Sequence, residues 1–566
     1  MTMPLPVERT VEDAAAIRAG IAMERLLNTW LRERMTESVP VEGEACTLNV
    51  GANRLRASCL RASPGGFHRW RLPVLIEQAD GSATATDDPI LIASLMADAL
   101  TEENGSISPA IKERLIKALK GAEEHALACG ARPIDCSPMG LEQSLWHGHP
   151  FHPFAKSIDG FSADDTDCYA PERARGFQLR WIIAETDVGA ALWRDRQVQE
   201  RVRRILADLS GLPENAISGR LLIPSHPWQA ARLETDPSFA DLVARGRAIL
   251  TLPTGATMQP TSSVRTVFAP SANMFLKLPI AARITNFART NPRDQIARSM
   301  AAEQALAAIA KQVAACGLDV LDEPGAVWID HPGLEAITAV VLRDAPRREA
   351  FVLAGLLEPS PNDGRPMLET MGCGFSGLAA AQAWLRAYVQ TAILPPLRLF
   401  ARTGVSLEAH SQNSLLELDR GTPARLIVRD LEGVSIDRER FERIAPGLEL
   451  NPSVFFLAEE ARQRLVYYLI SNQLNHVVAA VSLLADAPEG DLWRSIAEAL
   501  STAAEDSPTA SLVAWLLEAE TLPAKANFTS CFAGRGERPD YVEIPNPLRP
   551  ALRDGYALQQ STVALS

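Results

Sequence analysis

The middle of the chain, from about residue 140 to residue 290, differs in pattern from the sequence on either side of it. It consists of short β-branched and aromatic runs, such as FQLRWIIAET, GRLLIPSHPW and MFLKLPIAARIT, which proline and glycine interrupt. Such runs are typical of strands, and the breaks between them are typical of loops. This region therefore predicts an antiparallel sheet with functional loops.

The sequence before this region is predicted to be helical. Apolar residues recur at near-helical spacing over 17–31, with charged residues between them, and residues 90–128 repeat the pattern. After the region, Asn291 and Pro292 predict the N-cap and first turn of a helix that ends at Gly317.

The last third is again predicted to be mainly helical. A long helix over 377–400 is bent at Pro395 and Pro396, and a nearly all-apolar helix spans 460–484. A short β-like insertion that begins at LEAHSQN lies between them. Taken together, these patterns predict an α+β fold.

Composition and charge narrow the function. With 566 residues, 47% of them apolar and 22% charged, the chain is typical of a globular protein of several domains. The formal net charge of −13 argues against a nucleic-acid binder, because phosphate affinity is built from surplus positive charge. Any anionic substrate must therefore bind at a local basic pocket.

Cysteine usage and the N-terminal sequence predict the compartment. The eight cysteines show neither CxxC pairs nor zinc-finger spacing. The N-terminal MTMPLPVERTVEDAAA lacks a basic segment followed by an apolar one, and no run approaches the ~18 apolar residues of a membrane span. We therefore expect a cytoplasmic protein with reduced thiols, no membrane contact and no nucleic-acid partner.

The first segment that concentrates polar side chains is WHGHPFHPFAKSIDGF, which contains His147, His149, His152 and Lys156. Three closely spaced histidines suggest zinc, but the HExxH helix is absent and the prolines prevent one helix from presenting all three ligands. We favour a loop that binds an anion through Lys156 and the histidine donors. A zinc site and a purely structural loop are the alternatives.

The second segment runs from residue 261 to residue 290, and its polar side chains fall on otherwise apolar runs: Ser263, Arg265, Lys277, Arg283, Thr285 and Arg289. Side chains at alternating positions share one face of a sheet. Guanidinium groups bind phosphates and carboxylates bidentately, and the helix N-terminus after Arg289 adds its dipole. The segment predicts the basic pocket; the alternative is a solvated sheet face paired with acidic side chains.

The third segment joins a polar loop to an acidic turn. The loop contains Glu408, His410, Gln412 and Asn413, and after a strand-like RLIV the turn contains Asp430 and Glu432. Carboxylates are hard ligands for Mg²⁺, and His410 and Gln412 can donate hydrogen bonds to a phosphate or a developing oxyanion. Walker A and GxSxG motifs are absent from the sequence.

Two further groups of residues are interpreted as structural. Asn472 and His476 lie four residues apart on the apolar late helix, where neighbouring groups are expected to satisfy buried polar atoms. Cys168 and Cys373 have no basic neighbour that would mark a reactive thiolate, so we interpret them as packing residues.

With these residues identified, the sequence resembles the NRPS-independent siderophore synthetases, the aerobactin-synthetase-like IucA/IucC family. Five motifs carry the resemblance, in the order and at the spacing of the family: GHPFHPFAKSIDGF (148–161), IPSHPWQ (223–229), SSVRT with LKLPIAARITNFAR (262–289), LEAHSQN (407–413) and RDLEG (429–433). The resemblance extends from about residue 140 to the C-terminal region.

For the fold, the resemblance implies an open hand with a distantly kinase-like ATP cleft. A helical thumb would span 1–165, β-rich fingers 166–370 and a mainly helical palm 371–566, with ATP between the fingers and the palm. We also expect a homodimer.

For the function, the resemblance implies an ATP- and Mg²⁺-dependent ligase of siderophore biosynthesis. Such an enzyme adenylates a carboxylate of citrate or a citrate derivative and condenses it with an amine, hydroxylamine or alcohol, which gives an amide or an ester. Alternatives are the same chemistry on 2-oxoglutarate and a kinase-like phosphotransferase that forms ADP. The stretch AKANFTSCFAGRGERPDYVEIPNPL does not match one subgroup securely, so the nucleophile is not identified.

The resemblance also implies roles for residues. The residues matched to ATP binding are Ser263, Arg265, Lys277, His410, Gln412 and Asn413. Those matched to the acid substrate are His149, His152, Lys156, Thr285, Arg289 and His410. Arg289, His410 and Lys277 are the expected catalytic residues. Asp430 and Glu432, with help from Asn413, are expected to bind Mg²⁺.

Overall fold

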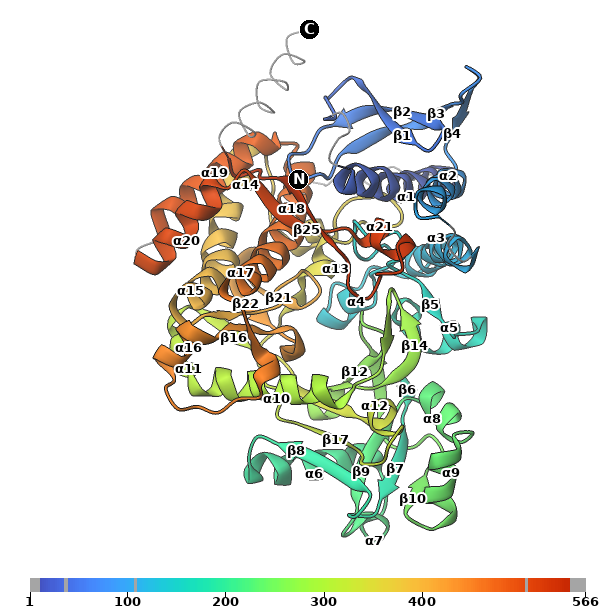
Figure 1. The fold of residues 1–566 in the computed structure, drawn as a ribbon, viewed down its shortest axis with the longest axis vertical. Coiled ribbons are helices and arrows are strands. Elements are labelled where there is room, and N and C mark those ends of the chain that lie inside the picture. The colour runs from blue at the N-terminus through green and yellow to red at the C-terminus, as the bar shows by residue number, and fades with distance from the viewer. Residues whose placement is uncertain (1–10, 35–38, 106–108, 504–506, 550–566) are drawn as a thin grey trace, which may run out of the picture.

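The computed structural model describes residues 11–34, 39–105, 109–503 and 507–549 (Figure 1). Helices and mainly antiparallel sheets occupy different parts of these ranges, which confirms the predicted α+β class. Residues 1–10, the first part of the N-terminal sequence MTMPLPVERTVEDAAA, lie outside the described ranges. No helix in those ranges is long and apolar enough to cross a membrane.

The N-terminal part combines the predicted helices with a sheet that the sequence pattern did not reveal. Met23, Leu27 and Trp30 on one face of the first helix pack against a four-stranded antiparallel sheet. The second strand of this sheet alternates buried and exposed residues. The elements are α1 (Val11–Glu33), β1 (Ala45–Val50), β2 (Asn53–Arg61), β3 (Arg69–Glu77), β4 (Ala83–Thr86), α2 (Pro89–Glu103), α3 (Pro109–Gly130), α4 (Pro138–Glu142), β5 (Ile158–Asp159) and α5 (Ala163–Tyr169).

The predicted antiparallel sheet follows. Seven strands pair in the order β6-β11-β12-β13-β18-β17-β8, and three more in the order β10-β7-β9. The strands are β6 (Phe177–Gln178), β7 (Arg180–Ala184), β8 (Gly189–Trp193), β9 (Leu221–Ser225), β10 (Ala248–Leu250), β11 (Thr257–Pro260), β12 (Thr266–Ala269), β13 (Met274–Lys277), β17 (Gly325–Ile329) and β18 (Val340–Asp344). Helices in this region are α6 (Arg196–Ser210), α7 (Glu214–Ile217), α8 (Pro227–Leu233), α9 (Pro237–Ala244) and α12 (Glu335–Thr338).

A small three-stranded sheet joins this region to the loop of residues 147–157, which we call the HPFHP loop. β14 (Ile280–Ile284) pairs with β15 (Phe287–Arg289) on one side and with β5, which directly follows the loop, on the other. Gln229 in α8 accepts a hydrogen bond from the Ala281 N–H of β14 (2.8 Å). The second and first polar segments of the sequence therefore lie side by side.

The predicted helix after Asn291 is present but begins and ends differently. α10 (Arg293–Ala308) has Pro292 rather than Asn291 at its N-cap. The helical run is interrupted at Ile309 and resumes as α11 (Ala310–Ala315). Gly317 follows with a φ of 78°, so its left-handed conformation ends the run as predicted.

A mixed sheet brings the third polar segment together. Its order is β16-β22-β21-β19, from β16 (Leu318–Val320), β19 (Phe351–Val352), β21 (Ser414–Asp419) and β22 (Thr422–Val428). β21 begins directly after LEAHSQN, and its partner β22 ends directly before RDLEG. The Arg429 N–H accordingly donates to the Asn413 carbonyl (2.9 Å), so the polar loop and the acidic turn are neighbours.

Both long helices predicted in the last third are present, and each contains a π-helical turn. The first consists of α14 (Leu378–Tyr388), η4 (Val389–Ile393) and α15 (Leu394–Thr403), with Pro395 and Pro396 in the first turn of α15. The second consists of α17 (Ala458–Val466), η7 (Tyr467–Leu474) and α18 (Asn475–Ala485). π-Helical turns are frequent at functional sites. Other elements here are α13 (Leu353–Leu357), β20 (Val405–Ser406), η5 (Leu431–Gly433), β23 (Ser435–Asp437), α16 (Arg438–Ile444), β24 (Phe455–Phe456), α19 (Glu489–Ala503) and α20 (Ser507–Glu518).

The C-terminal segment returns to the N-terminal helices. After β25 (Thr521–Lys525), α21 (Asn527–Phe532) lies beside the helices drawn in blue in Figure 1, and β26 (Tyr541–Pro545) pairs back with β25. Phe528 packs edge-on against Trp30 of α1. Glu33 accepts hydrogen bonds from the Phe528 and Thr529 N–H groups (both 2.8 Å), which stabilises the first turn of α21. These contacts fix the position of β25 relative to the rest of the chain.

Candidate functional site

Two basic side chains on neighbouring strands meet the acidic turn. Lys277 ends β13, and Arg343 lies on β18, whose Val341 is the residue opposite Lys277, so the two cations are diagonal neighbours on one sheet face. Lys277 Nζ lies 2.7 Å from Asp430 Oδ1 and 3.6 Å from Glu432 Oε2. Arg343 Nη2 lies 3.2 Å from Asp430 Oδ2 and 2.6 Å from the buried Glu323. The structure therefore brings predicted phosphate-binding and metal-binding residues into one cluster.

Asp430 is held in an unusual state by this cluster. Burial raises the pKa of its carboxyl, but the charges of Lys277 and Arg343 outweigh burial and hold the pKa well below its usual range. Asp430 also has a φ of 73°, a conformation that a non-glycine residue rarely adopts. Strained backbone of this kind clusters at functional sites. The ionised carboxylate is thus fixed at the start of the RDLEG turn.

A buried network that the sequence did not reveal ties three motifs together. Glu142 of α4 accepts from Arg429 Nη1 (2.6 Å) through one carboxylate oxygen and from the Ser262 N–H and hydroxyl (3.0 and 2.6 Å) through the other. Arg429 also donates to the Gln412 carbonyl (2.8 Å), and the Gln412 amide donates to Ser262 (3.3 Å). The side chain of Gln412 is therefore engaged with SSVRT. Glu142 lies in an ordinary helical stretch, where no sequence signal marks it.

Arg265 and Asn291 form the floor of the basic cluster. Arg265 is buried, and its Nη1 donates to Asn291 Oδ1 (2.7 Å) and to the carbonyls of Arg289 (3.2 Å) and Thr290 (3.1 Å). Asn291 Nδ2 donates to the carbonyls of Lys277 (3.1 Å) and Ala339 (2.7 Å). The expected N-cap is thus a buried cross-link, because three groups of the sheet compete for its amide. Burial lowers the pKa of Arg265 despite the nearby Asp430 and Glu432.

Arg289 differs from the other cations, because its guanidinium has no hydrogen bond or ion pair to any described residue. It is only partly buried, at the end of β15, and its Cζ lies 5.5 Å from the centroid of the Phe287 ring. Burial and the charge of Arg265 lower its pKa to about 10, so it is still charged at neutral pH. Thr285, on the same hairpin, has a φ of 61°, which a β-branched residue adopts only under strain. The hairpin therefore presents a charged group that is available to a ligand.

His410 is ordered by its own loop. Its Nδ1 accepts hydrogen bonds from the N–H groups of Gln412 (3.2 Å) and Asn413 (3.3 Å). Burial lowers its pKa, with the charges of Lys525 and Arg429 acting the same way and Glu408 and Asp430 opposing them. The ring is thus neutral at neutral pH, and Nε2 carries its proton. Ser263, at the SSVRT turn, accepts from the Thr266 N–H through its hydroxyl (3.1 Å).

Two histidines of the HPFHP loop contact the other motifs. His149 Nε2 lies 3.0 Å from Asn472 Nδ2, and Asn472 Oδ1 accepts from the Ser411 N–H (3.3 Å) of LEAHSQN. His152 Nε2 lies 2.9 Å from Asn286 Nδ2 of the β14–β15 turn. Burial lowers the pKa of His149 well below its usual value and that of His152 to about 3, so both rings are neutral. Asn472, interpreted from the sequence as structural, therefore connects the loop to the site.

Lys156 and His147 are held inside the protein, away from these contacts. The Lys156 ammonium forms a buried ion pair with Glu172. The peptide groups on either side of His147 are also taken: Glu358 accepts from the His147 and Gly148 N–H groups, and Arg25 donates to the His147 carbonyl. The structure therefore favours a structural role for Lys156, because an internal carboxylate already neutralises it. The sequence could not reveal Glu172 as this partner.

A second basic group near His410 comes from the C-terminal segment. Lys525 ends β25, and its Nζ lies 3.2 Å from the Tyr468 hydroxyl of η7 and 5.1 Å from the Tyr467 ring. Burial lowers its pKa, against the charge of Glu408. Tyr468 in turn lies 5.7 Å from the His410 ring, centroid to centroid. Lys525 is thus a candidate site residue in the stretch that the sequence analysis left unmatched.

The acidic groups of the site suit Mg²⁺ better than zinc. Glu432 is partly exposed beside Asp430, and a Cβ at Gly433 would overlap the carboxylate of Glu408, which places three carboxylates around the RDLEG turn. Mg²⁺ typically uses one or two carboxylates together with substrate phosphates and water. Across the described residues, no group of three or more His, Cys, Asp or Glu side chains is arranged to hold a metal ion by itself.

Comparisons with known proteins agree with this assembly of motifs. A family model described as "IucA / IucC family" matches residues 137–358, and one described as "Ferric iron reductase FhuF-like transporter" matches residues 382–540. The chain is 31% identical over 570 residues to an L-2,3-diaminopropanoate–citrate ligase of Staphylococcus aureus (strain NCTC 8325 / PS 47), with 94% of this chain and 96% of the relative covered. It is 27% identical to the rhizobactin siderophore biosynthesis protein RhbC of Rhizobium meliloti (strain 1021), with 94% and 97% covered.

A solved structure confirms the fold. The ATP-bound aerobactin synthetase IucA from a hypervirulent pathotype of Klebsiella pneumoniae superposes with a TM-score of 0.83 at 23% identity, and the match covers 94% of this chain and 99% of that one. The relationship therefore extends over nearly the whole chain and both of its halves. The chain belongs to the IucA/IucC family of NRPS-independent siderophore synthetases.

Proposed function

We propose that this protein is an ATP- and Mg²⁺-dependent ligase that adenylates a carboxylate of citrate and joins the acyl group to an amine. The observation that carries the proposal is the arrangement of Arg289: a charged side chain without a hydrogen-bond or ion-pair partner among the described residues, next to cations that acidic groups already hold in place. The citrate and amine classes are supported by the name of the Staphylococcus aureus relative. The ATP requirement is supported by the ATP-bound state of the IucA structure.

The first half-reaction brings two anions together. A citrate carboxylate oxygen attacks the α-phosphorus of ATP, the bond to the bridging oxygen breaks, and pyrophosphate leaves. Arg289 binds the carboxylate, and Arg265 and Lys277 lower the repulsion between the reactants, because cations in a water-poor site act strongly on nearby anions. The protonated Nε2 of His410 donates a hydrogen bond to the phosphate oxygens. Thr285, in the turn between β14 and β15, and Ser263, in the SSVRT turn, supply hydroxyl groups.

The residues present fit a magnesium ion, although Asp430 is engaged with two cations. Glu432 and Asp430 would hold it, with Asn413 nearby as an amide ligand. When bound, the ion supplies charge neutralisation at the pyrophosphate leaving group. Lys277 sits between the two carboxylates and keeps them from repelling each other before the substrates bind.

In the second half-reaction the amine nitrogen attacks the acyl carbon, AMP leaves and the nitrogen loses a proton. Glu408, whose charge acts on Lys525, suits an ammonium substrate. Lys525 provides a further cation for a tricarboxylate. His149 and His152 are neutral and add no charge, and because both nitrogens of each ring have partners inside the protein, they position the HPFHP loop beside the acid. Positioning of the reactants supplies much of the rate.

Product analysis tests this function. Purified protein is incubated with ATP, Mg²⁺ and hydroxylamine as a surrogate nucleophile, in parallel with citrate, 2-oxoglutarate, succinate and no acid. We expect AMP, pyrophosphate and a hydroxamate with citrate. ADP as the product, or turnover that does not depend on any acid, would contradict the ligase. A hydroxamate with 2-oxoglutarate alone would keep the chemistry and replace the acid.

A further inference from the structure

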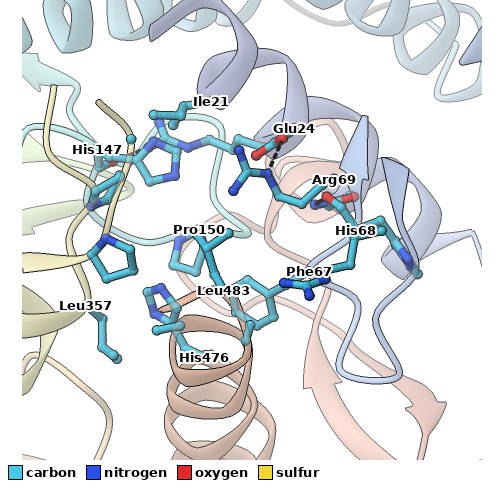
Figure 2. A pocket seen from close by; sticks show the side chains of 18 of the residues that line it. Ile21, Glu24, Phe67, His68, Arg69, His147, Pro150, Leu357, His476 and Leu483 are labelled. Carbon is cyan, nitrogen blue, oxygen red and sulfur yellow. Dashed lines mark hydrogen bonds and ion pairs between the residues drawn. The ribbon is translucent and has the colours of Figure 1, made fainter. Parts of the chain in front are cut away.

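A separate cavity lies behind the HPFHP loop. Figure 2 shows His147 and Pro150 of this loop facing it, opposite Phe67 and His476, with Glu24 and Arg69 at one side. His149 and His152, which alternate with these loop residues, are absent from its lining and instead contact Asn472 and Asn286. The cavity and the proposed catalytic site therefore use opposite sides of one loop.

Arg25 is the arginine of this cavity that forms no ion pair with a described residue, although the charge of the buried Glu358 acts on it. It comes from α1, only 3% of its surface is exposed, and it lines the cavity. Its only hydrogen bond to a described residue goes to the His147 carbonyl, and its Nε has no partner. The other two arginines of the wall are paired, Arg69 with Glu24 (2.6 Å) and Arg61 with Asp486 (3.0 Å). A buried cation without a direct ion pair is costly, and a bound anion would lower that cost.

The size and lining of the cavity indicate the kind of apolar group that a ligand with an anionic group on Arg25 would carry. Its volume is about 120 Å³, close to the ~150 Å³ of an apolar cavity that takes one benzene ring. Apolar groups form much of the wall, among them Phe67, Leu357 and Leu483. The Phe67 ring stacks on His476, with 4.9 Å between centroids, so one side of the wall is a flat aromatic surface.

We propose that this cavity is a second binding site, which takes a small carboxylate with an apolar or aromatic body and seats the carboxylate on Arg25. The site is also connected to the catalytic one. His476, in its wall, lies one helical turn after Asn472, the partner of His149, and the HPFHP loop contributes to both sites. A ligand that changes the position of this loop must change binding of the acid, and the coupling is reciprocal.

Calorimetry with benzoate as the probe tests binding on the full chain, without ATP or acid. We expect benzoate to bind with a Kd of about 1 mM or tighter, which suits a ligand of this size. Benzamide, which has the same shape without the charge, is expected to bind at least about tenfold more weakly. No binding of benzoate, or equal binding of the two probes, would overturn the proposal.

Three variants locate the site. Arg25→Gln is expected to weaken benzoate at least about tenfold and to leave benzamide unchanged. Ala479→Phe, which fills the cavity from its wall, is expected to abolish binding of both probes and keeps the test decisive if Arg25→Gln does not fold. Arg61→Gln, an arginine of the same wall that is already paired, is the matched control and should change neither probe more than about twofold. Unchanged benzoate binding in Ala479→Phe would place the ligand elsewhere.

The connection between the sites rests on the proposed function, so it is measured separately, as the effect of benzoate on citrate binding. Saturating benzoate is expected to change the Kd for citrate at least about threefold in the wild type, and not in Ala479→Phe. An unchanged citrate Kd would overturn the coupling. If citrate itself does not bind, the proposed function fails, while the benzoate measurements still decide whether the second site exists.

Discussion

The β13–β15 strands and the HPFHP loop both carry cations that the sequence marks as anion-binding, but the structure treats them differently. In the loop, Lys156 is neutralised by the buried Glu172. On the strands, Lys277 is held between two partly exposed carboxylates, and Arg289 has no ionic partner among the described residues. The difference shows that a basic residue becomes available to a ligand when the fold withholds an internal counter-ion from it.

The largest effect is expected at Arg289. Arg289→Ala should reduce citrate-dependent adenylation at least about 10³-fold, because it removes a charge that contacts the reacting carboxylate in a water-poor site. The melting temperature should not fall, since the side chain makes no hydrogen bond to any residue that the structure describes. Acid-dependent ATP–pyrophosphate exchange and thermal unfolding measure the two quantities.

Arg283→Ala is the matched control for this variant. Arg283 lies on β14 and is about half exposed, and within the described ranges its one ion pair is with Glu537 at 3.9 Å. It should keep activity within about twofold of the wild type. Near-normal exchange in Arg289→Ala, or an equal loss in both variants, would contradict the site assignment.

A substitution at Asp430, unlike Arg289→Ala, should lower both activity and stability. Asp430→Asn is expected to lower activity about 10²-fold or more and also to reduce stability by about 3 kcal/mol, because it leaves Lys277 and Arg343 with fewer counter-ions in buried positions. Exchange kinetics and denaturant unfolding test this. A variant with full stability would show that the two cations do not depend on Asp430.

Variants of the Lys156–Glu172 pair distinguish a structural role of Lys156 from a substrate-binding one. Lys156→Met should lower activity about tenfold and destabilise the protein, because Glu172 is then buried without its partner. The double variant Lys156→Met/Glu172→Gln removes both charges, and most of the stability and activity should return. If the double variant is stable but still inactive, Lys156 contacts the substrate, as the resemblance implied.

The smallest effect concerns pH and Glu358. Burial raises the pKa of its carboxyl to about 8, against the hydrogen bonds from the His147 and Gly148 N–H groups and the charges of Lys156 and Arg25. A raised folded-state pKa means that this stabilisation is complete below the unfolded pKa, ~4.5, and is lost as the pH rises through about 8. Glu358→Gln should therefore match the wild type at pH 5 and melt about 1–2 °C higher at pH 9.

Thermal unfolding at a series of pH values measures this difference. The same variant should leave the pH dependence of adenylation near neutral pH unchanged, because His149, His152 and His410 are already neutral there. A melting temperature that is lower than the wild type at every pH would show that the carboxylate is needed in its ionised form.

Local sequence patterns predicted those parts of the fold that depend on residues close together in the chain. The late helices, the strands before residue 290 and the helix end at Gly317 follow from spacing and from glycine and proline chemistry. The four-stranded N-terminal sheet was missed because its strands lie between strong helical patterns. Asn291 was assigned to a helix cap because the sequence cannot show that Arg265 and two carbonyls compete for its amide.

In the candidate site, too, residue types could be predicted from the sequence, but long-range partners could not. The residue types at Lys277, Arg289, His410 and Asp430 indicated an anion and metal site, and the structure brings them together. Glu142 and Lys525 were missed because their significance comes from partners more than 50 residues away in the sequence, Arg429 and Tyr468. The lobe boundaries, a homodimer, Mg²⁺ binding and a cytoplasmic location stay predictions.

The most direct test of this account is citrate-dependent ATP–pyrophosphate exchange in the wild type, Arg289→Lys and Arg289→Ala under the same conditions. We expect exchange only with the acid present, partial loss in the lysine variant, since it keeps the charge but not the bidentate geometry, and near-complete loss in the alanine variant. Exchange that is independent of citrate, or equal in all three proteins, would show that Arg289 does not bind the reacting carboxylate.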